Sequence, residues 1–155
     1  MKIKSFTMVV VCSLILLGCK KDDFIESNEL MISLSGDIGA GKYNTWTHSA
    51  ELPYFDISSY SNIKSVVMAV NNIKTSDETG NDVIGEASFE LYDITNDKPI
   101  ENSIVISDDI ENNSYKSSAN IINDIPRQKI KLGIRVSSDG DFSTSCSHIY
   151  LILSR

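Results

Sequence analysis

The sequence is poor in the residues that most often carry chemistry, with three cysteines and two histidines among 155 residues. His48 and His148 are far apart in the chain and lack the spacing of a zinc site, and no nucleophile elbow is present. The paired carboxylates of a glycosidase meet only in space, so a small glycan-active enzyme stays as a third alternative. We expect no catalytic residue, no metal site and no cofactor.

Long apolar runs are also missing. The longest, Met8 to Leu17, contains Ser13 and is about ten residues long, whereas a membrane-spanning helix needs about 20. Lys2 and Lys4 precede this run and Gly18 follows it, which is the order of a secretory signal peptide. The pattern predicts a cleaved signal over residues 1–18 rather than a retained transmembrane anchor.

The end of this signal carries a specific motif. Leu16-Leu17-Gly18-Cys19 resembles the lipobox of bacterial lipoproteins. The resemblance implies that the signal is cut before Cys19 and that Cys19 is acylated on its sulfur and on its new amino group. Two or more acyl chains anchor a protein stably, whereas one chain binds a membrane only marginally. We therefore expect Cys19 to be the lipidation site.

The residues after Cys19 bear on localisation. Lys20 replaces the Asp that retains Gram-negative lipoproteins in the inner membrane, so the resemblance implies a lipid-anchored protein of the outer membrane. Lys20-Lys21-Asp22-Asp23 is similar to the short signal that exports lipoproteins to the cell surface in Bacteroidota, although an ordinary charged tether has the same composition. We expect residues 19–28 to form a lipidated tether and the domain to face the cell exterior.

The mature chain is acidic. Removal of the first 18 of the 155 residues leaves 137, enough for one domain with a hydrophobic core. These residues include 12 basic and 21 acidic side chains, a net charge of −9, which argues against nucleic acid and against electrostatic docking on anionic lipid. Without Cys12 and Cys19, Cys146 has no disulfide partner in the mature chain, and we expect it to be a half-buried, small apolar residue.

Residues 29–155 alternate between apolar and polar side chains, most clearly from Ile130 to Val136. No amphipathic helix is present to connect parallel strands. We therefore predict one all-β domain, an antiparallel β-sandwich of eight or nine strands, with a jelly roll preferred and an immunoglobulin-like sandwich as the alternative. The predicted strands are 30–35, 43–48, 54–57, 62–71, 87–93, 100–106, 115–122, 130–136 and 147–153, with Pro53 as an interruption and loops at 36–41, 75–82 and 137–141.

The segment from Gly36 to Lys42 fits the G-x-x-x-x-G-K part of a phosphate-binding loop. However, Tyr43 stands where that loop has a Ser or Thr that binds magnesium. The residues that follow alternate as a strand, so no helix N-terminus is available to hold a phosphate. We interpret the segment as a glycine-rich connection between two strands.

The densest aromatic stretch contains Tyr43, Trp46 and Tyr54, and it includes the single tryptophan. Aromatic faces stack on sugar rings, so these three residues are the candidate ligand site. Alternatively, Trp46 fills the core and the tyrosines cap its edges. The acidic clusters Asp77-Glu78, Asp108-Asp109-Glu111 and Asp139-Asp141 lack the spacing of a calcium loop and are interpreted as solvated turns.

These observations favour a non-catalytic, lipid-anchored, surface-exposed lipoprotein whose β-sandwich binds an extracellular glycan or an envelope protein. The alternative is a structural or accessory envelope subunit with no small-molecule site.

Overall fold

The computed structural model describes residues 28–35, 38–42, 47–107, 115–138 and 140–155. Nearly all of the regular structure is antiparallel β, and the helix among these residues is a 3-10 turn, η1 (Ile57–Ser59). In the described part of the chain, no helix is long and apolar enough to cross a membrane. The predicted all-β class is confirmed. The signal peptide, Cys19 and the tether up to residue 27 lie outside the described residues.

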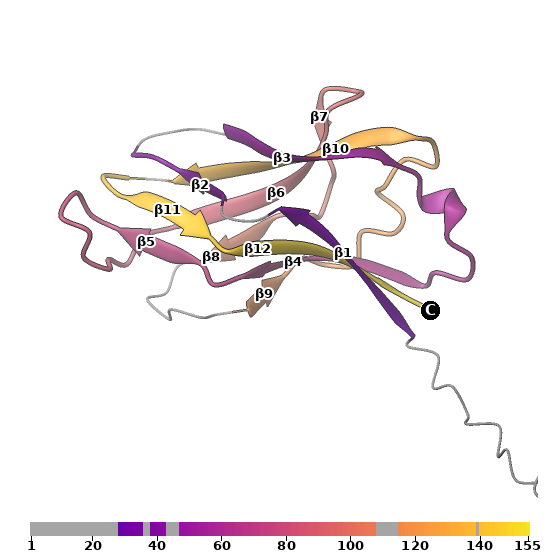
Figure 1. The fold of residues 1–155 in the computed structure, drawn as a ribbon, viewed down its shortest axis with the longest axis horizontal. Helices are drawn as coiled ribbons and strands as arrows, with labels where there is room; N and C mark the ends of the chain where they lie inside the picture. Colours follow the sequence, from indigo (N-terminus) through magenta and orange to yellow (C-terminus); the bar gives the residue numbers. More distant parts are fainter. Residues whose placement is uncertain (1–27, 36–37, 43–46, 108–114, 139) are drawn as a thin grey trace, which may run out of the picture.

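The first sheet forms one layer of the molecule (Figure 1). Its order is β1 (Glu29–Ser35), β12 (His148–Ser154), β4 (Ser65–Asn71) and β9 (Tyr115–Ser117). A three-stranded sheet continues it in the same order, with β2 (Ile38–Ala40), β11 (Ser143–Cys146) and β5 (Lys74–Ser76). The register is also continuous, because Asn71 pairs with His148 and Lys74 pairs with Ser145. The two sheets are therefore one layer with an interruption.

The interruption falls at Asn72 and Ser147. Asn72 adopts a left-handed backbone conformation with φ of 61°, which asparagine tolerates better than most residues. Its Nδ2 donates to Ser147 Oγ at 3.1 Å, and the Ser147 N–H donates to the Asn71 carbonyl at 3.2 Å. These bonds join the β4–β5 connection to the β11–β12 connection across the break.

The second sheet packs against the first (Figure 1). It contains β3 (Thr47–Phe55), β10 (Ile130–Ser138) and β6 (Ala87–Asp93), with β7 (Lys98–Pro99) and β8 (Val105–Ser107) both paired to β6. If each interrupted strand counts once and the short β7 is set aside, the first sheet takes the first, eighth, third and sixth strands of the chain. The second sheet takes the second, seventh, fourth and fifth. This alternation is the strand order of a jelly roll, so the preferred topology is confirmed rather than the immunoglobulin-like one.

The core lies between the two sheets, where alternate residues of each strand are apolar. On β10 these are Ile130, Leu132, Ile134 and Val136, all nearly inaccessible to solvent. The predicted strand 62–71, which is nearly continuous in apolar residues, forms β4 over Ser65–Asn71 and lies between β12 and β9. The other large, fully buried side chains are Phe89, Met68, Leu91, Ile100, Ile121, Ile149, Leu151, Leu153 and Val66.

The predicted interruption at Pro53 is wrong, because β3 continues through it to Phe55. β3 is an edge strand, where a residue without an N–H is tolerated. The register against β10 shifts here, since Phe55 pairs with Ile130 but Leu52 pairs with Leu132. Tyr54, in this bulge, has a φ of 70°. The proline therefore coincides with a bulge rather than with the end of a strand.

Three short strands occur where loops were predicted or no strand was expected. They are β2 in the glycine-rich segment, β5 at the start of the 75–82 loop, and β11. Each has only three or four residues, and β5 and β11 are rich in Ser and Thr, so none shows a clear apolar alternation. Their pairing depends on the neighbouring strands rather than on their own pattern.

The predicted strands 100–106 and 115–122 are too long, since only β8 and β9 form there. In the rest of these two segments no strand forms, and serine hydroxyls accept hydrogen bonds from the backbone N–H groups of β6 and β4. Ser103 Oγ accepts the Leu91 N–H at 3.0 Å, and Ser118 Oγ accepts the Met68 N–H at 2.9 Å. Local polar side chains commonly compete with sheet bonding in this way.

Candidate functional site

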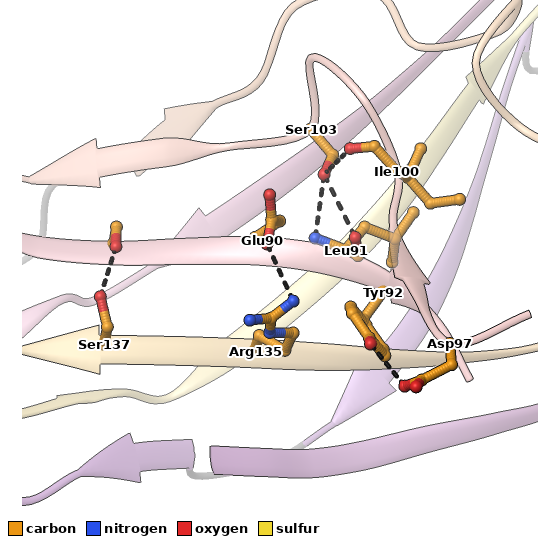
Figure 2. Close-up of polar contacts among 9 residues, drawn as sticks. Glu90, Leu91, Tyr92, Asp97, Ile100, Ser103, Arg135 and Ser137 are labelled. Carbon is orange, nitrogen blue, oxygen red and sulfur yellow. Dashed lines mark hydrogen bonds and ion pairs between the residues drawn. The ribbon is translucent and has the colours of Figure 1, made fainter. Parts of the chain in front are cut away.

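A strip of polar side chains lies on the outer face of the second sheet (Figure 2). Because Phe89 and Leu91 point into the core, the alternate residues of β6 point outward. The outward residues of β10 are placed beside them by the register, which pairs Arg135 with Glu90. We call this set the polar strip: Ser88, Glu90, Tyr92, Arg135 and Ser137.

Glu90 and Arg135 form an ion pair at the centre of the polar strip. Oε2 of Glu90 lies 3.9 Å from Nη1 of Arg135, and the two side chains are 17% and 21% exposed. Burial raises the pKa of Glu90, and the Arg135 charge offsets part of this increase. The distance is longer than a hydrogen bond of 2.7–3.2 Å, so these two atoms attract each other without a direct bond.

Tyr92 fixes one side of the arginine. The Arg135 Cζ lies 4.5 Å from the centre of the Tyr92 ring, a cation–π contact. The Tyr92 hydroxyl donates to Asp97 Oδ1 at 2.6 Å, and this hydrogen bond is the main reason why the pKa of Tyr92 is raised. The ring is therefore held from the β6–β7 turn, which limits the orientations of the guanidinium.

The start of β3, which follows Tyr43 and Trp46 in the sequence, lies beside the polar strip. On its other side β10 pairs with β3, with Arg135 opposite His48 and Val136 opposite Thr47. Trp46 directly precedes Thr47 in the sequence. Tyr43 and Trp46 themselves lie outside the described residues. The backbone register thus brings the start of β3 next to the Glu90–Arg135 pair.

Tyr54 lies at the other end of β3. It is seven residues beyond Thr47, or about 23 Å along an extended strand at about 3.3 Å per residue. The side chain is 73% exposed, and Lys129 Nζ lies 4.3 Å from the centre of its ring. Of the three aromatic residues expected to form the site, Tyr54 is therefore placed away from the Glu90–Arg135 pair, and it lies three residues beyond Glu51, which is level with the Tyr92 end of the polar strip.

Cys146 and His148 do not form a nucleophile–base pair. Cys146 is 2% exposed and packs in the core, so it is more deeply buried than the half-buried position that was expected. His148 is exposed and stacks on Tyr150, with ring centres 5.9 Å apart. Because Ser147 separates β11 from β12, these two residues do not share a face as i and i+2 of one strand would: the thiol points inward and the imidazole points outward.

The acidic residues of the loop after β5 bind groups of the same loop and of the glycine-rich segment. Asp77 Oδ1 accepts the Thr79 and Asn81 N–H groups at 2.8 and 2.9 Å, and also the Thr79 hydroxyl. These bonds lower the pKa of Asp77. Glu78 forms an ion pair with Lys42 from the glycine-rich segment. Within the described ranges, no three His, Cys, Asp or Glu side chains gather as metal ligands do; residues 108–111 and 139 fall outside these ranges.

Sequence reasoning missed the polar strip. Its residues are the polar positions of two amphipathic strands, which are usually only solvated. The sequence does show that Arg135 and Glu90 face outward, but their pairing depends on the strand register. Only the order and register of β6 and β10 bring them together.

The chain matches no family model, and comparisons with curated proteins and with solved structures find no similar protein.

Proposed function

We propose that this chain is a lipid-anchored outer-membrane lipoprotein, exposed at the cell surface, whose jelly roll binds an extracellular glycan without catalysis. The lipobox-like segment ending at Cys19 supports the anchor. The polar strip, and the aromatic residues Tyr43 and Trp46 that precede β3 in the sequence, support the binding site. A jelly roll suits this role because its sheet presents a rigid outer face while its inner face is buried.

The Glu90–Arg135 pair is the observation that carries the proposal. The 3.9 Å separation allows one sugar hydroxyl to bridge the pair, donating to the carboxylate and accepting from the guanidinium. Bonds to charged groups are stronger than those between neutral groups. Both side chains are partly shielded from water, which strengthens such bonds further.

The polar strip lacks an open aromatic face on which a sugar ring could stack, and the aromatic stretch would supply one. The Tyr92 ring is almost fully buried and packs on Arg135, so it offers little open face for stacking. Trp46 and Tyr43 lie just ahead of the part of β3 that pairs beside Arg135. An aromatic residue at that edge would stack on the sugar ring while the ion pair holds its hydroxyls.

The arrangement favours binding over hydrolysis. Glycoside hydrolysis uses two carboxyl groups that flank the bond to be cut. In the polar strip, Glu90 faces the Arg135 guanidinium, and in the adjacent β6–β7 turn the Asp97 carboxylate accepts the Tyr92 hydroxyl. Both carboxylates are therefore engaged by neighbours, which supports a role in holding a ligand.

A glycan array tests this function. The mature protein should bind a subset of glycans, and Glu90→Gln and Arg135→Gln should each weaken that binding by about tenfold or more, since a tenfold change is about 1.4 kcal/mol and a hydrogen bond to a charged group contributes at least that much. Lys98→Gln, at an exposed position on β7, is the matched control and should bind normally. A folded protein that binds no glycan would instead favour an accessory envelope subunit.

A further inference from the structure

The outer face of the first sheet takes no part in the core or in the polar strip. Because Ile149, Leu151 and Leu153 of β12 point into the core, the alternate residues of this strand point outward. The register extends this alternation to β1, β4 and β9. We call the outward residues of these four strands the first-sheet face: Glu29, Met31, Ser33, Ser65, Val67, Ala69, Asn71, Tyr115, Ser117, His148, Tyr150, Ile152 and Ser154.

The first-sheet face carries very little charge. Charged residues make up 23% of the chain, but on these four described strands Glu29 is the one outward carboxylate and no outward residue is Lys or Arg. Depletion of charge is typical of the centre of a protein–protein interface, where tyrosine and methionine are enriched. Copies of this acidic chain repel each other, and a face with so little charge is where two of them can approach.

Apolar side chains form a row across three strands of this face. Met31 pairs with Ile152, and Ile152 pairs with Val67. The Met31 side chain is 55% exposed, and the other two are half-buried although they do not belong to the core. Neighbouring strands therefore present one continuous apolar strip to solvent.

Exposed apolar side chains also occur elsewhere, without this arrangement. Ile84 lies outside any strand, between β5 and β6, and Ile106 of β8 lies opposite the polar Ser88. Exposure by itself thus does not distinguish the first-sheet face. The distinguishing features are the continuous row and the way in which its side chains differ in size from one strand to the next.

The first-sheet face is self-complementary in the size of its side chains. On β12 the outward residues Tyr150 and Ile152 are large, whereas their partners on β4 are the smaller Ala69 and Val67. Ala69 has no exposed area although it points outward, because larger neighbours surround it. A two-fold axis that runs parallel to the strands, between β12 and β4, would place Ile152 of one copy against Val67 of the other. The same axis would place Tyr150 against Ala69.

We infer that the first-sheet face binds a second copy of this chain, in an isologous dimer about this axis. Two sheets that pack face to face commonly keep their strands aligned, as this axis requires. The two Glu29 side chains then lie at opposite edges of the interface, about 14 Å apart across three strand spacings of about 4.8 Å. This separation exceeds the Debye length of about 8 Å at physiological salt, so their repulsion is screened.

The size of the first-sheet face predicts a weak dimer. Four strands about 4.8 Å apart and seven residues of about 3.3 Å each give at most about 440 Å² per copy. A standard stable interface buries about 800 Å² per partner. We therefore expect copies in solution to associate in the micromolar to millimolar range.

The proposed lipid anchor would strengthen this association. The chain enters β1 at Asn28, at the same end of the molecule as the C-terminus (Figure 1). An axis parallel to the strands keeps Asn28 of both copies at one end, so both tethers reach the same membrane. Anchoring in one membrane raises the effective concentration of the copies. The second sheet of each copy faces away from the interface, which leaves both polar strips open.

Sedimentation equilibrium of the mature chain, residues 19–155, tests the dimer; Cys19→Ala prevents this thiol from cross-linking two copies. We expect a monomer–dimer equilibrium. Ile152→Lys and Val67→Glu should each weaken association about tenfold or more, because each buries a charge without a partner. An equimolar mixture of these two variants should associate again, because the introduced lysine of one copy then faces the introduced carboxylate of the other.

The matched controls are Ile106→Lys and Ile106→Glu, which change an apolar side chain that is 45% exposed on the second sheet. They should associate as wild type does, and circular dichroism checks that every variant is folded. A wild-type chain that stays monomeric at millimolar concentration would overturn the inference. So would equal weakening by the Ile106 variants, or a mixture of folded variants that fails to associate. Because no glycan or acyl chain is present, these results are separate from any failure of the proposed function.

Discussion

Glu90 and Arg135 lie opposite each other on β6 and β10, with Oε2 3.9 Å from Nη1, on a sheet whose other face is mainly apolar. The two side chains are less exposed than charged residues usually are. A sheet that needed only a solvated outer face could use any polar residues here. The placement of a shielded ion pair beside the start of β3 is what makes this face a candidate binding surface.

The pKa of Glu90 predicts a pH-dependent stability. Because burial raises it above its ordinary value of 4.5, the folded protein holds this proton more tightly than the unfolded chain does. The contribution of Glu90 to stability is therefore present below pH 4.5 and is lost as the pH rises through the folded pKa. In urea titrations at several pH values, the unfolding free energy of Glu90→Gln should rise relative to wild type over this window. A difference that is constant with pH would show that Glu90 titrates normally.

Ser103 should contribute to the stability of the domain at the edge of the second sheet. Its buried hydroxyl accepts the Leu91 N–H at 3.0 Å and donates to the Ile100 carbonyl at 2.7 Å (Figure 2). Ser103→Ala leaves the Leu91 N–H buried without this acceptor, which costs about 1–3 kcal/mol of unfolding free energy. Chemical denaturation measures the loss, and Ser145→Ala, at an exposed position, is the control. Equal stability of the two variants would show that water replaces the hydroxyl.

Gly85 should tolerate no side chain while Phe142 is present. A Cβ on Gly85 would come within 2.2 Å of Cζ of the Phe142 ring, whereas a Cβ on Gly41 would meet nothing within 4 Å. Gly85→Ala should therefore destabilise the domain by about 1–3 kcal/mol, as overpacking usually does. Gly41→Ala should be nearly neutral. In the Phe142→Leu background the penalty of Gly85→Ala should shrink, and an unchanged penalty would place its cause elsewhere.

Cys19→Ala should abolish acylation. The protein should then leave the membrane fraction or accumulate with its signal uncut, because acyl chains supply the attachment. Fractionation and metabolic labelling with a fatty-acid analogue measure both outcomes. Cys146→Ala is the matched control, since that thiol is buried in the core, and it should stay membrane-bound and labelled. A Cys19→Ala protein that partitions with membranes as wild type does would contradict the lipid anchor.

The sequence predicts the layers of this fold better than its edges. Alternation from Ile130 to Val136 and the β-branched run of β4 identify core strands, because burial between two sheets demands those patterns. The edges follow other rules. Pro53 is accommodated in a bulge of β3, and Ser103 replaces a backbone acceptor with a hydroxyl. Neither device produces an apolar period, so pattern analysis places the strand ends incorrectly.

The candidate site was only partly predictable. The aromatic stretch is visible in the sequence, but Tyr54 turns out to lie at the far end of β3 from Thr47. Glu90 and Arg135 are 45 residues apart and are joined only by the register of β6 and β10. No local pattern encodes that register, because it follows from how the whole jelly roll closes.

Fluorescence titration of the single tryptophan tests glycan binding most directly. The mature protein is titrated with the glycan that it binds best on an array, and the emission of Trp46 is followed. We predict a saturable change in wild type and in Lys98→Gln, and a dissociation constant about tenfold or more weaker in Arg135→Gln, equivalent to at least about 1.4 kcal/mol. Binding that is equally tight in Arg135→Gln, or the absence of any glycan that binds, would contradict the proposed role of the polar strip.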